Sequence, residues 1–258
     1  LFLTPSQLRA TMIVALSVLT AAGALSYSSF KLGKHTERNV NVGCSSATQE
    51  MMAHESWEAV VDNYVYIHNA FRNDLQRMII SCEKNKFIIG ELETWRDILE
   101  LHSRVEDEII VVALQARLRR QKEDRLPNEV LNGSDHDAVA LLTDKCLECT
   151  DNAERLKLLK KLAFNLEVHL KREEEVMMML LMKYFSKREL WALDSFIVNP
   201  KLTYCDNKEM LIKITKWWLS NIQLSEGRKL LVNFVKAGRQ PPMPIEGWKK
   251  LQDDIPEL

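Results

Sequence analysis

With 258 residues and a mass of 29.9 kDa, the chain can form one sizeable hydrophobic core or two small ones. Its net charge of −1 lacks the basic excess that nucleic-acid-binding domains usually carry, so we expect no nucleic-acid partner. It contains only 8 Gly and 7 Pro, and no segment alternates polar and apolar residues as a half-buried strand would, which predicts an all-α fold.

Residues 10–30 form a run of 21 residues without a charge. At about 1.5 Å per residue, a helix of this length crosses a hydrocarbon layer of ~30 Å. We therefore predict that residues 1–31 are a transmembrane or signal-anchor segment and that residues 32–55 are a linker.

More basic residues follow this segment than precede it: Lys31, Lys34 and Arg38 come after it, and Arg9 comes before it. The positive-inside rule then predicts a single-pass membrane protein with its large C-terminal part in the cytosol. Two alternatives remain open. A start at Met12 would make the segment a removable targeting sequence, leaving a soluble intracellular protein, and a chain that begins with Leu suits a fragment of a longer protein.

Four helices are expected within residues 56–185, because apolar residues recur there with a period near 3.6. They span roughly residues 56–80, 88–120, 134–149 and 153–185, and the third begins at Ser134 or Asp135, either of which suits an N-cap. The predicted inward residues are Val61, Tyr64, Val65, Phe71, Leu75 and Met78 in the first helix; Trp95, Ile98, Leu99, Val105, Ile109 and Val112 in the second; Val139, Ala140 and Cys146 in the third; Leu159, Leu162, Leu166, Val176, Met177, Leu180 and Tyr184 in the fourth.

Each of these stripes also contains a histidine, and the four histidines follow one another at intervals of 34, 34 and 33 residues. They are His68, His102, His136 and His169. Glu106 and Glu173 follow the second and fourth histidines by four residues, which places them on the same helical face at a Cβ separation of roughly 5–6 Å. Each His–Glu pair can therefore contact one metal ion, or two neighbouring ions.

A single histidine on an apolar face is usually a core residue with a hydrogen-bond partner, and a single glutamate there can extend to the solvent. The repetition on four helices argues against that explanation. Burying an unpaired carboxylate costs on the order of several kcal/mol, and no Lys or Arg is expected on the same stripes, so Glu106 and Glu173 require a cation. Glu174 competes with Glu173 for the ligand role, whereas Glu175 is expected to face solvent.

Other polar or sulfur-containing residues have simpler explanations. His54 is expected at the surface, and the methionine run 177–179 is expected to fill the core. The five cysteines are odd in number and irregularly spaced, which indicates reduced thiols in an intracellular compartment. Cys146 and Cys149 form one CxxC pair, but a structural zinc site would need a second pair, so no function is expected for it.

Four imidazoles and two carboxylates suit a pair of iron ions, because two-iron sites are characteristically built from Glu and His side chains in the core of a helical bundle. The motifs are His68-Asn-Ala-Phe, His102-Ser-Arg-Val-Glu106, Ser134-Asp135-His136 and His169-Leu-Lys-Arg-Glu173. In this order they resemble the hemerythrin-like family, also called the HHE cation-binding domain, over about residues 56–185. The stretch that begins at His169 and the segments Lys216-Trp-Trp-Leu and Leu224-Ser-Glu-Gly are similar to the iron-sensing modules of BRUTUS-type ubiquitin ligases.

The resemblance implies an up-down four-helix bundle with His68, His102, His136 and His169 as terminal ligands of two iron ions and with Glu106 and Glu173 as bridges. Oxygen-carrying members have a second histidine one turn after the first on the third helix, where this chain has Ala140. The expected function is therefore a binding or sensing module that responds to iron, to oxygen or to both, rather than oxygen transport. The alternative is a diiron redox enzyme that acts on oxygen, peroxide or nitric oxide, with Tyr64 as the best candidate for an additional acid or base. The cysteines that a ubiquitin ligase would need are missing, so ligase activity is not inferred.

Residues 186–258 are expected to form a C-terminal helical extension, with short helices near residues 207–219 and 225–236. Its aromatic residues are expected to pack over one end of the bundle, and a protein-binding surface is the alternative. These residues are Trp191, Trp217, Trp218 and Phe234.

Overall fold

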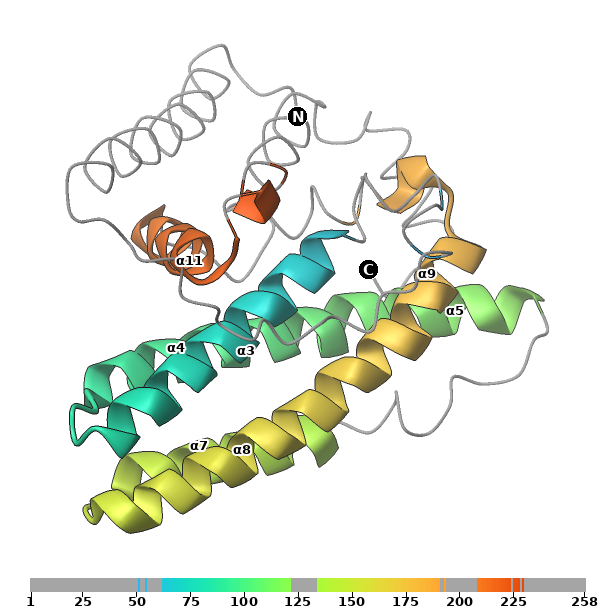
Figure 1. Cartoon of the computed structure of the whole chain (residues 1–258). Coiled ribbons are helices and arrows are strands. Elements are labelled where there is room, and N and C mark those ends of the chain that lie inside the picture. The colour runs from blue at the N-terminus through green and yellow to red at the C-terminus, as the bar shows by residue number, and fades with distance from the viewer. Residues whose placement is uncertain are drawn as a thin grey trace.

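A computed structural model of the chain describes residues 62–121, 134–190 and 208–223, together with residues 51, 54, 193, 225–227 and 229. The regular secondary structure in these residues is helical and includes no strand (Figure 1). The prediction of an all-α fold is thereby confirmed for the part of the chain that the structure describes.

The predicted helices between residues 62 and 185 all form. The first is α3 (Asp62–Glu83), and the second runs from α4 (Ile89–Val105) through η2 (Glu106–Ile110) into α5 (Val111–Gln121). The third is α7 (Ser134–Glu148). The fourth runs from α8 (Asn152–Arg172) through η3 (Glu173–Met177) into α9 (Met178–Tyr184), and Figure 1 shows it as one continuous helix. The Asp151 side chain caps it by accepting a hydrogen bond of 2.7 Å from the Glu154 N–H.

Neighbouring helices bury their apolar faces against one another. Helix α3 packs against α4 and α8, α7 packs against the same two helices, and α5 packs against α9. The buried apolar residues form two clusters, and the boundary between the clusters falls between Leu99 and Ile109 on the second helix and between Leu170 and Met177 on the fourth. Both His–Glu pairs lie at or directly beside this boundary.

The elements η2 and η3 are single π-helical turns, and each begins at the glutamate of a His–Glu pair. In η2 the Val111 N–H bonds to the Glu106 carbonyl, and in η3 the Met178 N–H bonds to the Glu173 carbonyl. Such i to i+5 bonds accommodate one extra residue in the turn. The buried face of each helix is therefore displaced by one residue beyond the glutamate.

This displacement corrects the predicted core. Val112 and Leu180, which a regular α-helix would bury, are only half-buried, and Val176 is half-buried as well. Nearby residues on the displaced face occupy the core instead; they are Ile110, Ala113 and Leu114 on the second helix and Met178, Leu181 and Met182 on the fourth. The third helix also differs from the prediction, because Val139 and Cys146 are buried as expected whereas Ala140 is exposed.

Helix α11 (Lys208–Asn221), which lies in the predicted C-terminal extension, packs against α3. The Trp217 indole N–H donates to Asp74 at 2.6 Å, and the Asn73 amide donates to the Asn221 carbonyl at 2.8 Å. Trp217 and Trp218 are buried, and α11, which contains them, packs against α3. Trp191 and Phe234 lie outside the described residues.

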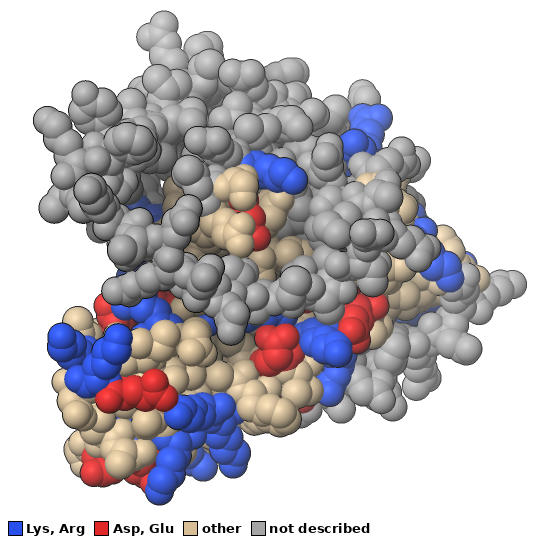
Figure 2. Space-filling view, viewed as in Figure 1, with Lys and Arg blue, Asp and Glu red and all other residues tan. Residues whose placement is uncertain are grey.

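Basic and acidic side chains alternate on the described surface seen in Figure 2. Exposed pairs include Lys157 with Glu154 at 3.0 Å and Lys160 with Glu83 at 2.9 Å. Pairs of this kind contribute about 0–1 kcal/mol.

No helix in the described part of the chain is long and apolar enough to cross a membrane. The predicted membrane segment, residues 10–30, and the predicted linker, residues 32–55, fall outside that part, apart from Met51 and His54. His54 is exposed, as expected.

The π-helical turn at Glu106 predicts unequal costs for two neighbouring truncations. Ile110→Ala should destabilise the protein by about 2–5 kcal/mol, because it removes a fully buried side chain. Val112→Ala should cost roughly 1 kcal/mol or less, since Val112 is half-buried. Urea unfolding measures the free energy of unfolding of both variants. A larger loss of that free energy for Val112→Ala than for Ile110→Ala would contradict the π-helical turn and support a regular α-helical register.

Candidate metal centre

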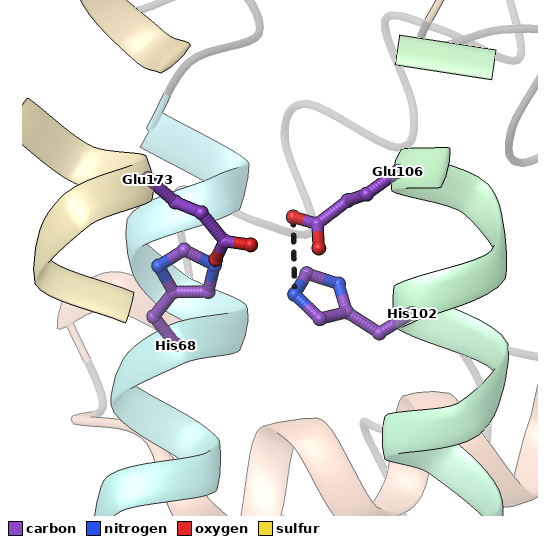
Figure 3. Close-up of side chains that lie close together, drawn as sticks. All are labelled: His68, His102, Glu106 and Glu173. Atoms are coloured by element: carbon purple, nitrogen blue, oxygen red, sulfur yellow. Dashed lines mark ion pairs between the residues drawn. The ribbon is translucent and has the colours of Figure 1, made fainter. Parts of the chain in front are cut away.

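Six predicted side chains meet at the boundary between the two apolar clusters. Helices α3, α4, α7 and α8 each supply one histidine, namely His68, His102, His136 and His169. Glu106 and Glu173 enter from the first residues of η2 and η3. Figure 3 shows the two carboxylates pointing toward each other, with His68 and His102 beside them. All six lie in buried or half-buried positions.

The donor atoms fall into two groups, in each of which the atoms lie within 4.8 Å of one another. We call the first group the His68–His102 position and the second the His136–His169 position. Glu106 and Glu173 belong to both groups. The site can therefore hold a metal ion in either position, and both positions use the same two carboxylates.

Each carboxylate directs one oxygen to each position. Glu106 Oε1 lies 3.3 Å from His102 Nε2, and Glu106 Oε2 lies 3.4 Å from His136 Nε2. Glu173 Oε2 lies 3.4 Å from His68 Nε2, and Glu173 Oε1 lies 3.0 Å from His169 Nε2. A carboxylate arranged in this way can bridge two ions.

The donor atoms of the centre are unsatisfied in hydrogen-bonding terms. Within the described part of the chain, the Nε2 atoms of the four histidines, both oxygens of Glu106 and Oε2 of Glu173 are buried without a hydrogen-bond partner. A buried polar atom left in this state costs about 1–3 kcal/mol, and native proteins contain few of them. Their convergence on one point fits a bound cation, and imidazole and carboxylate are suitable ligands for one.

Two further carboxylates orient two of the histidines from behind. His68 Nδ1 lies 3.0 Å from Glu174 Oε1, and His136 Nδ1 lies 3.1 Å from Asp107 Oδ2. A carboxylate on one ring nitrogen fixes the tautomer and leaves the other nitrogen to bind metal. Glu173 thus faces the centre, whereas Glu174 contacts His68 from outside it.

Sequence reasoning missed the role of Asp107, although a signal was present. Both His–Glu pairs are followed directly by another acid, Asp107 after Glu106 and Glu174 after Glu173. Each of these acids contacts a histidine of a neighbouring helix. Glu175, the next acid in the run, is exposed and lies 3.6 Å from Lys171, as expected for a surface residue.

The expectation that no Lys or Arg lies on the inward stripes was wrong, because Arg72 follows His68 by one turn and is buried. Its guanidinium binds both oxygens of Glu174 at 2.7 and 3.2 Å and also bonds to Glu167 at 2.7 Å. Burial alone would raise the pKa of Glu174, but the bonds from His68 and Arg72 hold it well below its usual range. No contact of Arg72 with Glu106 or Glu173 appears among the ion pairs of the described residues, so those two carboxylates still require a cation.

Charge in the centre is unevenly distributed before any metal binds. Burial and the charge of Glu173 hold the pKa of Glu106 well above its usual range. Burial alone would lower the pKa of His136, but the carboxylates of Glu106 and Glu173, which lie 3.4 and 3.6 Å from its Nε2, raise it to about 11. Burial and the other histidines hold the pKa of His102 well below its usual value. A bound cation would replace the proton that His136 holds between the two carboxylates.

Within the described residues, neither the cysteines nor the third helix adds a further donor. Cys146 is buried, Cys149 is half-buried, and both are free thiols. Among the described residues the groups that could hold a metal contain only histidine and glutamate. Ala140 is exposed, so α7 contributes the single donor His136.

Comparisons of the chain with protein-family models, with curated proteins and with solved structures find no match. The resemblance to the hemerythrin-like family therefore rests on the order of the motifs, and the metal centre rests on its geometry.

The shared carboxylates predict which substitutions remove bound metal. Glu106→Gln and Glu173→Gln keep the side-chain shape but each remove a charged donor from both positions, so each should abolish most of the bound metal. The control, Glu175→Gln, changes an exposed side chain and should retain the metal. Elemental analysis of the dialysed proteins gives metal per chain, and equal metal content in all three variants would contradict the assignment.

Proposed function

We propose that this chain is a hemerythrin-like diiron protein, in which α3, α4–α5, α7 and α8–α9 form an up-down four-helix bundle around two iron ions. The observation that carries the proposal is the pair of donor groups that share Glu106 and Glu173. One ion would lie between His68, His102 and the two carboxylates. The other would lie between His136, His169 and the same carboxylates.

The donor set suits iron. Imidazole suits zinc, copper, iron and nickel, whereas carboxylate suits harder ions such as manganese and magnesium. Iron accepts both ligand types, and two-iron or two-manganese sites built from Glu and His in a bundle core are a recurring arrangement. The centre has four imidazoles and two carboxylates, which favours the hemerythrin-like balance over the carboxylate-rich ferritin-like one.

The role that we propose is an iron- and oxygen-responsive binding or sensing module. Bound iron would supply oxygen binding and one-electron chemistry, while the protein would hold and orient the ions. The α7 helix contributes one donor, which suits a site with an incomplete ligand set rather than an oxygen carrier. Two aromatic rings lie beside the His68–His102 position. The centroid of the His102 ring is 5.3 Å from that of Phe71 and 6.4 Å from that of Tyr64.

Iron binding tests this proposal directly. The full chain, loaded anaerobically with Fe²⁺ and passed through a desalting column, should retain about two iron ions per chain. Exposure to oxygen should then produce near-ultraviolet absorption from a bridged ferric pair. The double variant Glu106→Gln/Glu173→Gln is the matched control and should show neither. Protein that retains no iron, with wild-type helicity by circular dichroism, would refute the diiron assignment.

A redox enzyme is the second candidate function, and the placement of Tyr64 favours it. Its ring centroid lies 6.1 Å from that of His68. Among the described residues, Tyr64 is the tyrosine whose ring contacts the histidines of the His68–His102 position. An enzyme should consume oxygen or peroxide over many cycles in the presence of a reductant, and Tyr64→Phe should slow that turnover. The sensing role predicts instead that uptake stops after about one equivalent of oxygen per two irons. An oxygen electrode distinguishes the two.

A further inference from the structure

The two metal positions share both carboxylates, so any difference between them must arise from the histidines and from what holds the histidines. His102 and His169 are alike in exposure, at 9% and 8% of their side chains. His68 and His136 are not alike: the side chain of His68 is 0% exposed and that of His136 is 15% exposed. The contrast between the positions therefore lies in this second pair.

The carboxylates that contact His68 and His136 from behind also differ in burial, and again the one on the His68 side is the more buried. Glu174, behind His68, is fully buried and is gripped by both terminal nitrogens of Arg72. Asp107, behind His136, is 46% exposed. In the described part of the chain its contact with His136 is the one ion pair that Asp107 makes. A buried bidentate pair with arginine fixes a carboxylate far better than contact with water does.

Arg72 is itself held on several sides. It bonds to Glu167 at 2.7 Å and to Asn69 Oδ1 at 3.5 Å, and Asn69 in turn donates to Glu226 at 2.9 Å. His68 thus stands at the buried end of a network that reaches the half-exposed Glu167 on α8 and the partly buried Glu226 after α11. His68 cannot rotate away from a metal without disturbing that network, whereas His136 can turn toward solvent by releasing one half-exposed carboxylate.

We propose that these supports make the two metal positions unequal: the His68–His102 position retains its ion, and the His136–His169 position exchanges its ion with the surroundings. Arg72 and Glu174 act as positioning residues, because Glu174 contacts His68, Arg72 contacts Glu174, and neither belongs to the two groups of donor atoms. The inference rests on the proposed function and deepens it. A position that exchanges follows the concentration of free iron while its neighbour stays filled, so the chain passes through a state with one ion, which is what an iron-responsive module needs.

The test is the rate at which each ion leaves. The full chain is loaded anaerobically with Fe²⁺, an excess of a coloured ferrous chelator is added, and absorbance is followed over time. We expect two phases of equal amplitude whose rates differ roughly 10–100-fold, the range typical for loss of a supporting residue behind a metal ligand. His136→Ala should retain one ion per chain and show the slow phase alone.

Two matched variants assign the phases. Glu174→Gln should accelerate the slow phase roughly tenfold or more and leave the fast phase unchanged, whereas Asp107→Asn should change the fast phase by less than that. If circular dichroism shows that Glu174→Gln does not fold, the variant Arg72→Lys is used in its place. Lysine keeps the positive charge but cannot form the bidentate hydrogen bonds that Arg72 makes with Glu174. Arg72→Lys should accelerate the slow phase as well.

The outcomes separate this inference from the proposed function. Release of two irons in a single phase, or equal effects of Glu174→Gln and Asp107→Asn, would overturn the inequality of the positions while leaving the diiron centre in place. A chain that binds no iron at all would overturn both.

Discussion

Two carboxylates, those of Glu106 and Glu173, lie buried within one cluster of imidazoles, and the centre must balance their charge in every state of the protein. Moving an ionised carboxylate out of water costs several kcal/mol unless a cation or a set of donors replaces the water. Without metal, part of the compensation comes from protons, since Glu106 has a raised pKa and His136 a pKa near 11. A pair of divalent ions would satisfy the same oxygens and also the four unpartnered Nε2 atoms.

The backbone of the second and fourth helices is adapted to these two carboxylates. Each helix makes a π-helical turn that begins at the glutamate, and the same turn places the following acid, Asp107 or Glu174, behind a histidine of another helix. The two halves of the centre are therefore built alike, from a His–Glu pair, a π-helical turn and a supporting acid. They differ in burial, and Arg72 strengthens one half only.

Most of this centre could be predicted from the sequence, because helical periodicity and the regular interval of the histidines are properties of local spacing. All six predicted ligand residues meet in one place, and Glu175 faces solvent as expected. The register beyond Glu106 and Glu173 could not be predicted, since a π-helical turn inserts a residue that a period of 3.6 does not allow for. Nor could Arg72 be recognised as buried, because its burial depends on Glu174 and Glu167 of a helix about a hundred residues away.

We have proposed that Glu106 and Glu173 bridge two ions, each of which is also bound by two histidines. A crystal structure of the iron-loaded protein, with anomalous scattering recorded at the iron absorption edge, measures the positions of the ions directly. We expect two peaks between the two carboxylates, one next to His68 and His102 and the other next to His136 and His169. A single peak bound by only one pair of histidines, or no peak between Glu106 and Glu173, would contradict it.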